Sequence, residues 1–276
     1  MAYVKEQFKD LDVMNNYLFN KLTTKKETAD KFCRLLLREL IGKELGRIII
    51  RSESVILPDN PEKRGVRLDV KIDEISNDET ITNIYDVEPH RDIETDYPKR
   101  TRYRQAQLDK DSMFSGDDNF NHMPELYIIN ITNYDPFGYD QMVYTIENQC
   151  VEVPELEYND DVKIYYFNTV GTKGGSSELK IFLNYLEEST TVNAVNEATK
   201  EVAEYVNYLK DDKALEGDYM TVGDWIDRIV KDAVEEAVAE AVAETVAKKD
   251  TEINQKNAEI ERMRKLLKEH NIIVNE

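Results

Sequence analysis

The apolar positions in the first third of the chain change from a helical to a strand-like spacing. Between residues 32 and 40 they recur at helical intervals, which predicts an amphipathic helix. Thr24 and Glu27 before this run have the spacing of a capping box, and Gly42 after it is a typical helix stop. Two short apolar runs over residues 48–57 then predict a bent first strand.

Residues 66–72 alternate strictly between apolar and polar side chains. Because successive side chains of a strand point to opposite faces, this pattern places Leu68 and Val70 on an apolar face and Asp69 on a polar face. A polar turn over residues 73–80 leads to a second strand over residues 81–88. We expect the two strands to pair as a hairpin.

The remaining pattern mixes helices with strands and then becomes helical. Pro98 suits the first turn of a helix that runs to Gly116. Strands are expected over residues 126–131, 141–146 and 162–167, and helices beyond residue 176. The sequence therefore predicts an α/β protein whose mixed central sheet is flanked by helices over residues 1–175. A helical region over residues 176–230 and a coiled-coil tail over residues 231–276 would follow.

The last predicted helix carries two apolar periods. Valine recurs every four residues from Val234 to Val246, whereas Ile253, Ile260 and Leu267 are seven residues apart. Seven-residue spacing is typical of a coiled coil, whose seam is buried only against a partner helix. We therefore expect a homo-oligomer formed through this helix, with a solvated single helix as the alternative. The two periods disagree about the supercoil, so the oligomer order stays open.

Charge is distributed unevenly along the 276 residues. A formal net charge of -20 would repel nucleic acid if it were spread evenly. Residues 1–110, however, hold 21 basic and 21 acidic side chains, and residues 111–276 carry the entire excess. Weak, salt-sensitive binding to DNA is therefore compatible with the neutral first segment.

Composition excludes several other classes of protein. With 41% hydrophobic residues the chain can bury a core, and no run of 18 apolar residues could cross a membrane. The first ten residues lack a secretory apolar region, so a cytoplasmic location is expected. Two cysteines, Cys33 and Cys150, are too few for a disulfide framework, and Cys33 falls within the apolar stripe of its helix as a core residue would.

Asp69 and Glu88 are the acidic pair that could carry chemistry. If the hairpin forms, they converge near one end of a sheet, with Asp86 and His90 in phase with Glu88. Two adjacent carboxylates repel each other unless a cation lies between them, and their hard oxygens suit magnesium or manganese. Such an ion can activate a water and stabilise the charge that develops on a phosphodiester. An ordinary polar strand face is the alternative.

Four basic residues occupy six consecutive positions, 99–104, on the helix that follows. Arg100, Tyr103, Arg104 and Gln107 would share one face of it. A basic face with an aromatic ring and an amide suits a phosphate backbone. A solvated face that pairs with nearby acidic residues is the alternative.

The remaining motifs carry no chemistry. The glycine-rich segment at residues 171–176 lacks the G-K-[ST] order of a phosphate-binding loop, so a surface turn is expected. His122 and His270 have no companions at metal-ligand spacing and are expected on the surface.

Three segments together carry a family resemblance: RGVRLDV at residues 64–70, YDVE at residues 85–88 and PKRTRYRQ at residues 98–105. In this order and spacing they resemble the bacterial recombination-promoting nuclease/transposase family, which belongs to the PD-(D/E)xK nuclease superfamily. YDPFG at residues 134–138 and YTIEN at residues 144–148 are supporting matches. The resemblance covers about residues 11–230.

The resemblance implies a restriction-endonuclease-like core in which Asp69 and Glu88 hold Mg²⁺ or Mn²⁺, with the carbonyl of Pro89 as a further ligand. His90 stands where the superfamily usually has lysine and this family glutamine, and it would handle the attacking water. A neutral histidine can position a water but cannot supply the permanent charge of a lysine. The residues that would contact substrate phosphates are Arg100, Arg102, Tyr103, Arg104 and Gln105.

The expected function is therefore a metal-dependent DNA endonuclease with a role in recombination or in a mobile element. Because His90 replaces the usual residue, a catalytically weakened or inactive descendant is the alternative, acting as a DNA-binding or oligomeric interaction module. A purely structural assembly protein has only the coiled-coil pattern in its favour.

Overall fold

A mixed six-stranded sheet flanked by helices and a long C-terminal helix make up this α/β protein. The computed structural model describes residues 6–57, 65–93, 95–113 and 119–269. The strands are β1 (Arg47–Ile56), β2 (Val66–Ile75), β3 (Ile81–His90), β4 (Glu125–Thr132), β5 (Val143–Ile146) and β6 (Val162–Asn168). The α-helices are α1 (Asn16–Thr24), α2 (Ala29–Ile41), α3 (Tyr97–Ser112), α4 (Ser177–Glu187), α5 (Glu197–Lys210) and α6 (Lys213–Glu269). Two short 3₁₀ helices are η1 (Phe8–Asp10) and η2 (Phe120–His122).

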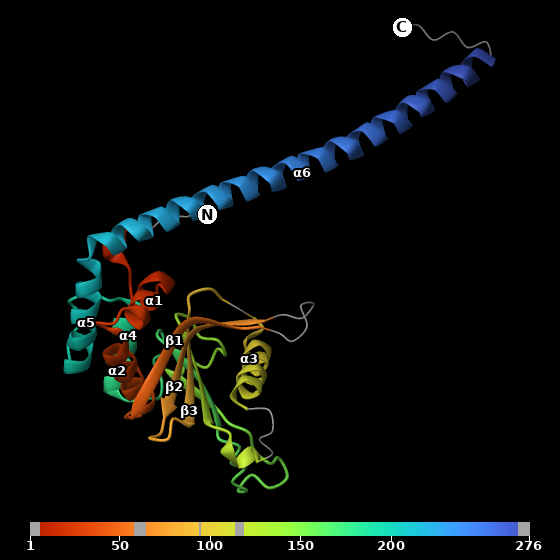
Figure 1. The fold of residues 1–276 in the computed structure, drawn as a ribbon. Coiled ribbons are helices and arrows are strands. Elements are labelled where there is room, and N and C mark those ends of the chain that lie inside the picture. The colour runs from red at the N-terminus through yellow and green to blue at the C-terminus, as the bar shows by residue number, and fades with distance from the viewer. Residues whose placement is uncertain (1–5, 58–64, 94, 114–118, 270–276) are drawn as a thin grey trace. The chain divides into compact units, whose positions relative to one another are not determined.

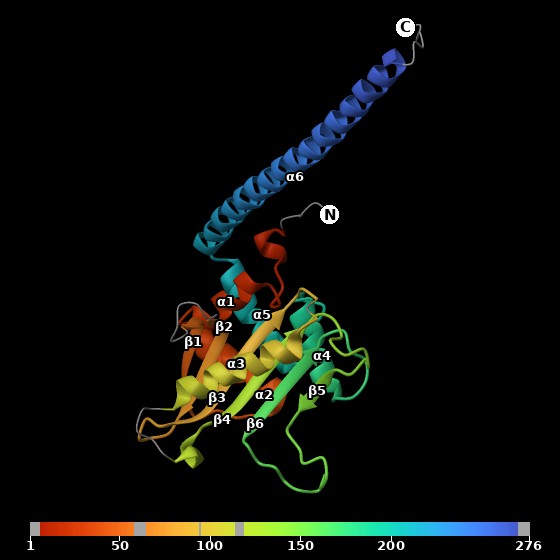
Figure 2. The same ribbon diagram turned by 90° about the vertical axis from the view of Figure 1, so that its right-hand side faces the viewer.

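The sheet has the strand order β1-β2-β3-β4-β6-β5. Strands β1, β2 and β3 form an antiparallel meander, β4 and β6 are parallel to β3, and β5 is antiparallel to β6. Helix α3 is the crossover that parallel pairing of β3 and β4 requires. It lies on one face of the sheet, and α1, α2, α4 and α5 lie on the other (Figures 1 and 2). The crossover brings the start of α3 near the end of β3.

The chain forms two compact units, Met1–Glu216 and Gly217–Glu276. Helices α4 and α5 therefore belong to the same unit as the sheet, where they pack with α1 and α2. This division has one boundary, in the first turns of α6, where the sequence analysis places two, at residues 175 and 230. Within the described part of the chain, none of the helices is long and apolar enough to span a membrane.

The leucine-rich helix α2 packs into the core as its apolar spacing predicts. Phe32, Leu36 and Leu37 are buried, and burying each such side chain stabilises the fold by about 1.5–3 kcal/mol. Cys33 is buried among them, which confirms a core cysteine. Gly42 ends the helix with a φ of 68°, a conformation that glycine adopts without strain.

The predicted start of this helix at Thr24 is wrong, because Thr24 is the last residue of α1. Its hydroxyl donates a hydrogen bond back to the carbonyl of Asn20 at 2.7 Å, as a residue at the end of a helix can. Thr28 instead precedes α2, and its hydroxyl binds the carbonyl of Leu22 at 3.0 Å. That bond ties the turn between the two helices to α1.

The predicted β2–β3 hairpin is confirmed, with a shorter turn than expected. Lys71 lies opposite Asp86, and Asp73 lies opposite Ile84. Strand β2 runs on to Ile75, so Asp73 belongs to the strand and is buried, not part of a polar turn. Asp73 remains buried because it forms ion pairs with Arg51 and Lys71.

The strict alternation expected for residues 66–72 is broken near Asp69. Leu68 belongs to the same hydrophobic cluster as Leu108 of α3, yet Lys71, three residues on, hydrogen-bonds to Asp111 of that same helix. Two residues three apart cannot share a face in a regular strand. The β1–β2 ladder also passes over the pair Glu53–Asp69, where Glu53 has a φ of 52°. The left-handed backbone of Glu53 coincides with the predicted bend of β1 and lies opposite Asp69, where β2 changes face.

Candidate active site

A pocket of about 230 Å³ lies where β2, β3, α1 and α3 meet. We refer to it as the Asp69 pocket. Each element supplies part of its wall: α1 one residue, β2 two, the end of β3 and the segment after it five, and α3 two. The lining residues are Asn16, Arg67, Asp69, Glu88, Pro89, His90, Arg91, Asp92, Arg100 and Arg104.

Asp69 and Glu88 come together in this pocket. The amide of Asp69 donates a hydrogen bond to Oε1 of Glu88 at 2.9 Å. The register that places Lys71 opposite Asp86 brings the two residues to facing positions where the ladder ends. The convergence predicted from the hairpin is therefore present, and the Glu88 side chain bridges the two strands.

Arg104 reaches the same carboxylates from α3. Its Nη2 donates to Oε2 of Glu88 at 3.0 Å, and its Nε lies 3.5 Å from Oδ2 of Asp86. A third contact joins its Nη1 to Oδ1 of Asn130 at 3.4 Å. Arg104 is 6% exposed. Its guanidinium is thus directed at buried carboxylates, whereas the sequence analysis places it on a phosphate.

Three carboxyl groups share the charge of this one guanidinium. Burial raises the pKa of Asp69, and the charge of Arg104 counteracts that rise. The pKa of Glu88 is well above its ordinary value because of burial and then the neighbouring Asp86. Burial likewise raises the pKa of Asp86 to about 6. The cluster therefore contains more acidic groups than Arg104 alone can hold ionised, a condition that a further cation would relieve.

His90 is a neutral residue in this setting. Burial first, and then the charges of Arg104 and Arg100, lower its pKa to about 3. Its ring packs edge-on against Tyr97, with 4.9 Å between the ring centroids. Among the described residues its Nε2 has no hydrogen-bond partner. An imidazole with such a low pKa is a weak proton acceptor, and it carries no charge near neutral pH.

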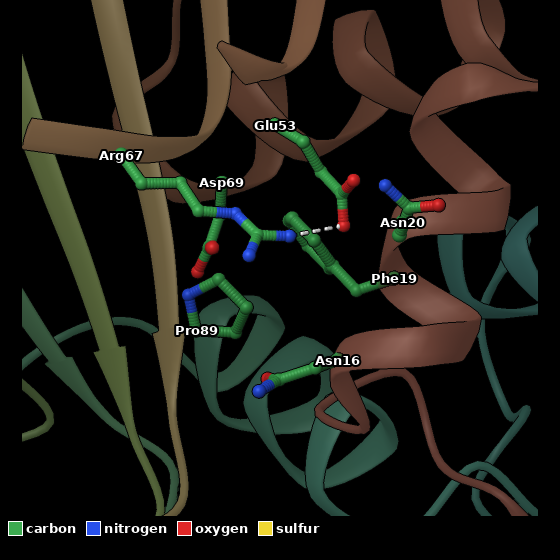
Figure 3. Close-up of a pocket in the computed structure, with 7 residues that line it drawn as sticks. All are labelled: Asn16, Phe19, Asn20, Glu53, Arg67, Asp69 and Pro89. Atoms are coloured by element: carbon green, nitrogen blue, oxygen red, sulfur yellow. Dashed lines mark ion pairs between the residues drawn. The ribbon is translucent and has the colours of Figure 1, made fainter. Parts of the chain in front are cut away.

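A second, adjoining pocket of about 220 Å³ opens toward α1 and contains Glu53, a residue that the sequence analysis did not single out. Figure 3 shows its lining, with Asp69 and Pro89 facing the side chains of α1. Nη2 of Arg67 lies 2.7 Å from Oε1 of Glu53, and this ion pair lies beside Asp69 in Figure 3. No local pattern marks Glu53, because its position depends on the left-handed backbone in β1.

A groove of about 600 Å³ adjoins the Asp69 pocket, with Arg67, Arg100 and Arg104 in the lining of both. We refer to it as the Arg100 groove. It lies between the start of β2 and the first two turns of α3. Basic side chains predominate in it, and Tyr103 adds an aromatic ring that is 39% exposed. The lining residues are Gly65, Val66, Arg67, Asp96, Lys99, Arg100, Tyr103 and Arg104.

The groove contains some of the predicted phosphate contacts and omits others. Arg100 and Tyr103 line it. Arg102 is exposed and lines neither the groove nor the Asp69 pocket. Gln105 hydrogen-bonds to Asp109 within α3 and also lies outside both.

The basic face predicted for α3 is not a single face. Its buried residues are Tyr97, Thr101, Arg104 and Leu108, at the i, i+4, i+7 and i+11 positions of one helical stripe. Arg104 therefore belongs to the buried stripe, whereas Tyr103 beside it is exposed. Arg67 and Lys99 line the groove although they were not among the predicted phosphate contacts. Their positions in the sequence could have indicated this, since Arg67 is two residues from Asp69 and Lys99 precedes Arg100.

The donor set of the Asp69 pocket fits a hard divalent cation. Asp69 and Glu88 offer carboxylate oxygens, Pro89 lines the same pocket, and two buried carboxyl groups, those of Asp86 and Glu88, share the buried guanidinium of Arg104. Among the described residues no three His, Cys, Asp or Glu residues are grouped closely enough to hold an ion by themselves. The set therefore suits magnesium, which keeps several waters and is usually bound through one or two carboxylates.

Comparisons of the chain with protein-family models, curated proteins and solved structures found no match. The geometry of the pocket and the groove is therefore the basis for the functional argument.

Proposed function

We propose that this chain is a metal-dependent DNA endonuclease that hydrolyses phosphodiester bonds in recombination or in a mobile element. One observation carries the proposal: the pocket that unites Asp69 and Glu88 adjoins a groove lined by Arg67, Lys99 and Arg100. A phosphodiester that lies along these basic side chains would reach the carboxylates of the adjoining pocket.

Asp69, Glu88 and the carbonyl of Pro89 are the groups that would hold Mg²⁺ or Mn²⁺. When bound there, the ion would supply Lewis-acid stabilisation of the charge on the reacting phosphate and lower the pKa of a nearby water. The mixed sheet with its two acidic strands side by side agrees with the restriction-endonuclease-like core that the sequence resemblance implies.

The other residues of the pocket have separate roles in this proposal. Arg104 holds Glu88 and Asp86 in place and partly neutralises them, so it is a positioning residue for the proposed ligands. His90 is neutral and would orient a water instead of supplying charge. Arg67, Lys99 and Arg100 would bind phosphates, and the exposed ring of Tyr103 offers a surface on which a base or sugar can pack.

Plasmid nicking in the presence of magnesium or manganese tests the proposal. We expect the wild-type protein to nick supercoiled DNA and the Asp69→Ala and Glu88→Ala variants to lose at least about a hundredfold in rate. Glu197→Gln is the matched control, because Glu197 is exposed at the start of α5 in another part of the fold. Equal cleavage by all four proteins, or cleavage by none of them, would reject the endonuclease assignment.

A non-catalytic DNA-binding or interaction module is the second candidate, and the contacts of Glu88 favour it. Both Glu88 oxygens already accept hydrogen bonds, one from the Asp69 amide and one from Arg104. His90 in addition lacks the permanent charge that a lysine would supply. DNA binding that Arg100→Gln weakens, together with an absence of nicking in either metal, would support this second function.

Isothermal titration calorimetry of the wild-type protein with manganese measures metal binding separately from DNA cleavage. The endonuclease proposal requires binding that Asp69→Ala abolishes. A protein that binds the metal without nicking DNA retains the site and lacks catalysis. A protein that does neither corresponds to the binding module.

A further inference from the structure

Helix α6 exposes a row of apolar side chains within the second compact unit. The row extends over nearly half of the helix, and its members are between 44% and 56% exposed. Large apolar side chains are seldom left in such a continuous row on a solvated helix. The residues are Val238, Val242, Val246, Ile253, Ile260 and Met263.

The two apolar periods of this helix fall on one face. With 100° of rotation per residue, the positions of Val238, Val242 and Val246 advance slowly around the helix, and Ile253 and Ile260 return into the same sector. Together with Met263 they occupy an arc of about 100°. The four-residue and seven-residue periods therefore describe a single stripe, not two competing ones.

Charge is segregated along the same helix. Residues 232–247 contain five acidic and no basic side chains, whereas residues 253–268 contain five basic and two acidic ones. Two such helices that run in the same direction would place the acidic segments against each other. Two that run in opposite directions would place each acidic segment against a basic one.

The apolar side chains of the stripe also differ in size on the two sides of residue 250, with valines before it and larger side chains after it. In an antiparallel pair centred there, Val246 falls within a residue of Ile253, and Val242 falls within two residues of Ile260. Val238 falls within a residue of Met263 in the same register. Small side chains then face large ones along the whole seam, which fills space better than valine against valine and isoleucine against isoleucine.

From these observations we propose that α6 binds the α6 of a second copy of this chain, antiparallel, with the two helices crossing near residue 250. Charge complementarity and the matched side-chain sizes select a second copy as the occupant of the stripe. This inference concerns the second compact unit alone and does not depend on the proposed endonuclease activity.

Light scattering of the full-length protein is the first test. We expect twice the 32.1 kDa mass of one chain, because two antiparallel α6 helices would each cover the stripe of the other. A monomeric mass at micromolar concentration would overturn the proposal. It would do so even if a different protein from a cell extract bound to the stripe.

Cysteine cross-linking of the full-length chain tests the orientation. In a Cys150→Ser background, which leaves only the buried Cys33, Lys249→Cys places a thiol in the stripe near the crossing point. We expect this variant to form a disulfide dimer under mild oxidation. Val238→Cys should not do so, because two antiparallel copies hold residue 238 about 36 Å apart. An equal mixture of Val238→Cys and Met263→Cys should again cross-link.

Each outcome decides between arrangements. Efficient dimers of Val238→Cys, at a yield like that of Lys249→Cys, would mean parallel helices and would contradict the proposal. Cross-linking of Lys249→Cys and of the mixed pair, but not of Val238→Cys or Met263→Cys alone, would support the antiparallel arrangement. Circular dichroism of each variant checks that α6 remains helical, so that a missing cross-link reflects distance and not unfolding.

Discussion

Arg104 connects the stability of the fold to the chemistry of the pocket. It is buried with Asp86 and Glu88, and two charged partners and Asn130 contact its guanidinium. A buried ion pair of this kind contributes little when intact, yet losing one partner leaves uncompensated charge. At the residue scale, removing Arg104 would therefore leave the carboxylates of Asp86 and Glu88 without the cation that they share.

Replacing Arg104 by methionine should destabilise the protein by about 3–5 kcal/mol near neutral pH, because Asp86 and Glu88 lose their shared cation. Urea denaturation followed by circular dichroism measures the change. Arg102→Met is the matched control, since Arg102 is exposed on the same helix and should cost less than about 0.5 kcal/mol. Equal effects of the two substitutions would contradict a special role for Arg104.

The pKa of Asp86 makes a second prediction at this scale. Burial raises that pKa from 3.8 to about 6, so the folded state binds this proton more tightly than the unfolded state. The resulting stability is present below pH 3.8 and is lost as the pH rises through about 6. Relative to Asp86→Asn, the free energy of unfolding of the wild type should fall by up to about 3 kcal/mol between about pH 4 and pH 7.

Urea denaturation in buffer with a chelator measures this difference without interference from divalent ions. The contribution of His90 to stability depends on pH in the opposite direction. Because its pKa is lowered in the folded state, it removes stability as the pH falls below the ordinary pKa of histidine. Both proteins retain His90, so its contribution cancels when they are compared. Parallel pH profiles for the wild type and Asp86→Asn would show that Asp86 titrates normally in the folded state.

At the scale of elements, periodicity predicts the helices and strands well, and long-range contacts decide the details. The hairpin that brings Asp69 to Glu88 follows from local pattern and is present. The face reversal in β2 does not, because the alternating pattern of residues 66–72 carries no sign of it. The local sequence predicts a turn at Asp73. In the structure Asp73 is buried in β2, where Arg51 and Lys71 neutralise its charge.

The candidate site was predictable to a similar extent. Asp69 and Glu88 could be named because carboxylates in phase on two adjacent strands are visible in the sequence. The role of Arg104 could not, because a run of basic residues looks solvated until the helix packs on the sheet. Once α3 packs on the sheet, the basic residues have different environments: Arg104 is buried, Arg100 lines the groove and Arg102 lies outside it.

The glycine-rich segment before α4 yields a prediction for an element junction. The expected surface turn holds for residues 172–176, which are exposed, whereas Gly171 is buried. A Cβ at Gly171 would lie 2.5 Å from the carbonyl oxygen of Gln141, so backbone would have to move. Gly171→Ala should therefore lower stability by about 1–3 kcal/mol, measured by thermal unfolding.

Gly217→Ala is the control for that substitution. Gly217 lies in the first turns of α6, and a Cβ there would have no neighbour within 4 Å among the described residues. Alanine favours a helix more than glycine does, so this change should be neutral or stabilising. A loss of stability in Gly217→Ala equal to that in Gly171→Ala would mean that steric contact with Gln141 is not the cause.

At the scale of the whole molecule, the proposed DNA-binding surface and the acidic excess of the chain belong to different segments of the sequence. The net charge of -20 belongs to residues 111–276, and the Arg100 groove is built entirely from the neutral first 110 residues. Attraction to a phosphate backbone therefore comes from a few side chains in a field that is otherwise unfavourable. Binding of this kind should be weak and steeply dependent on salt.

If Arg67, Lys99 and Arg100 of the groove bind phosphates as proposed, a plot of log K against log salt concentration should have a slope of about -3. Lys99→Gln and Arg100→Gln should each weaken binding and make the slope less steep by about 0.9, because each removes one contact that displaces a counterion. Fluorescence anisotropy with a short labelled duplex measures both quantities. Lys248→Gln, an exposed change in α6, should leave the slope unaltered if the groove is the binding surface. A slope that responds equally to all three substitutions would instead mean that DNA senses only the net charge of the chain.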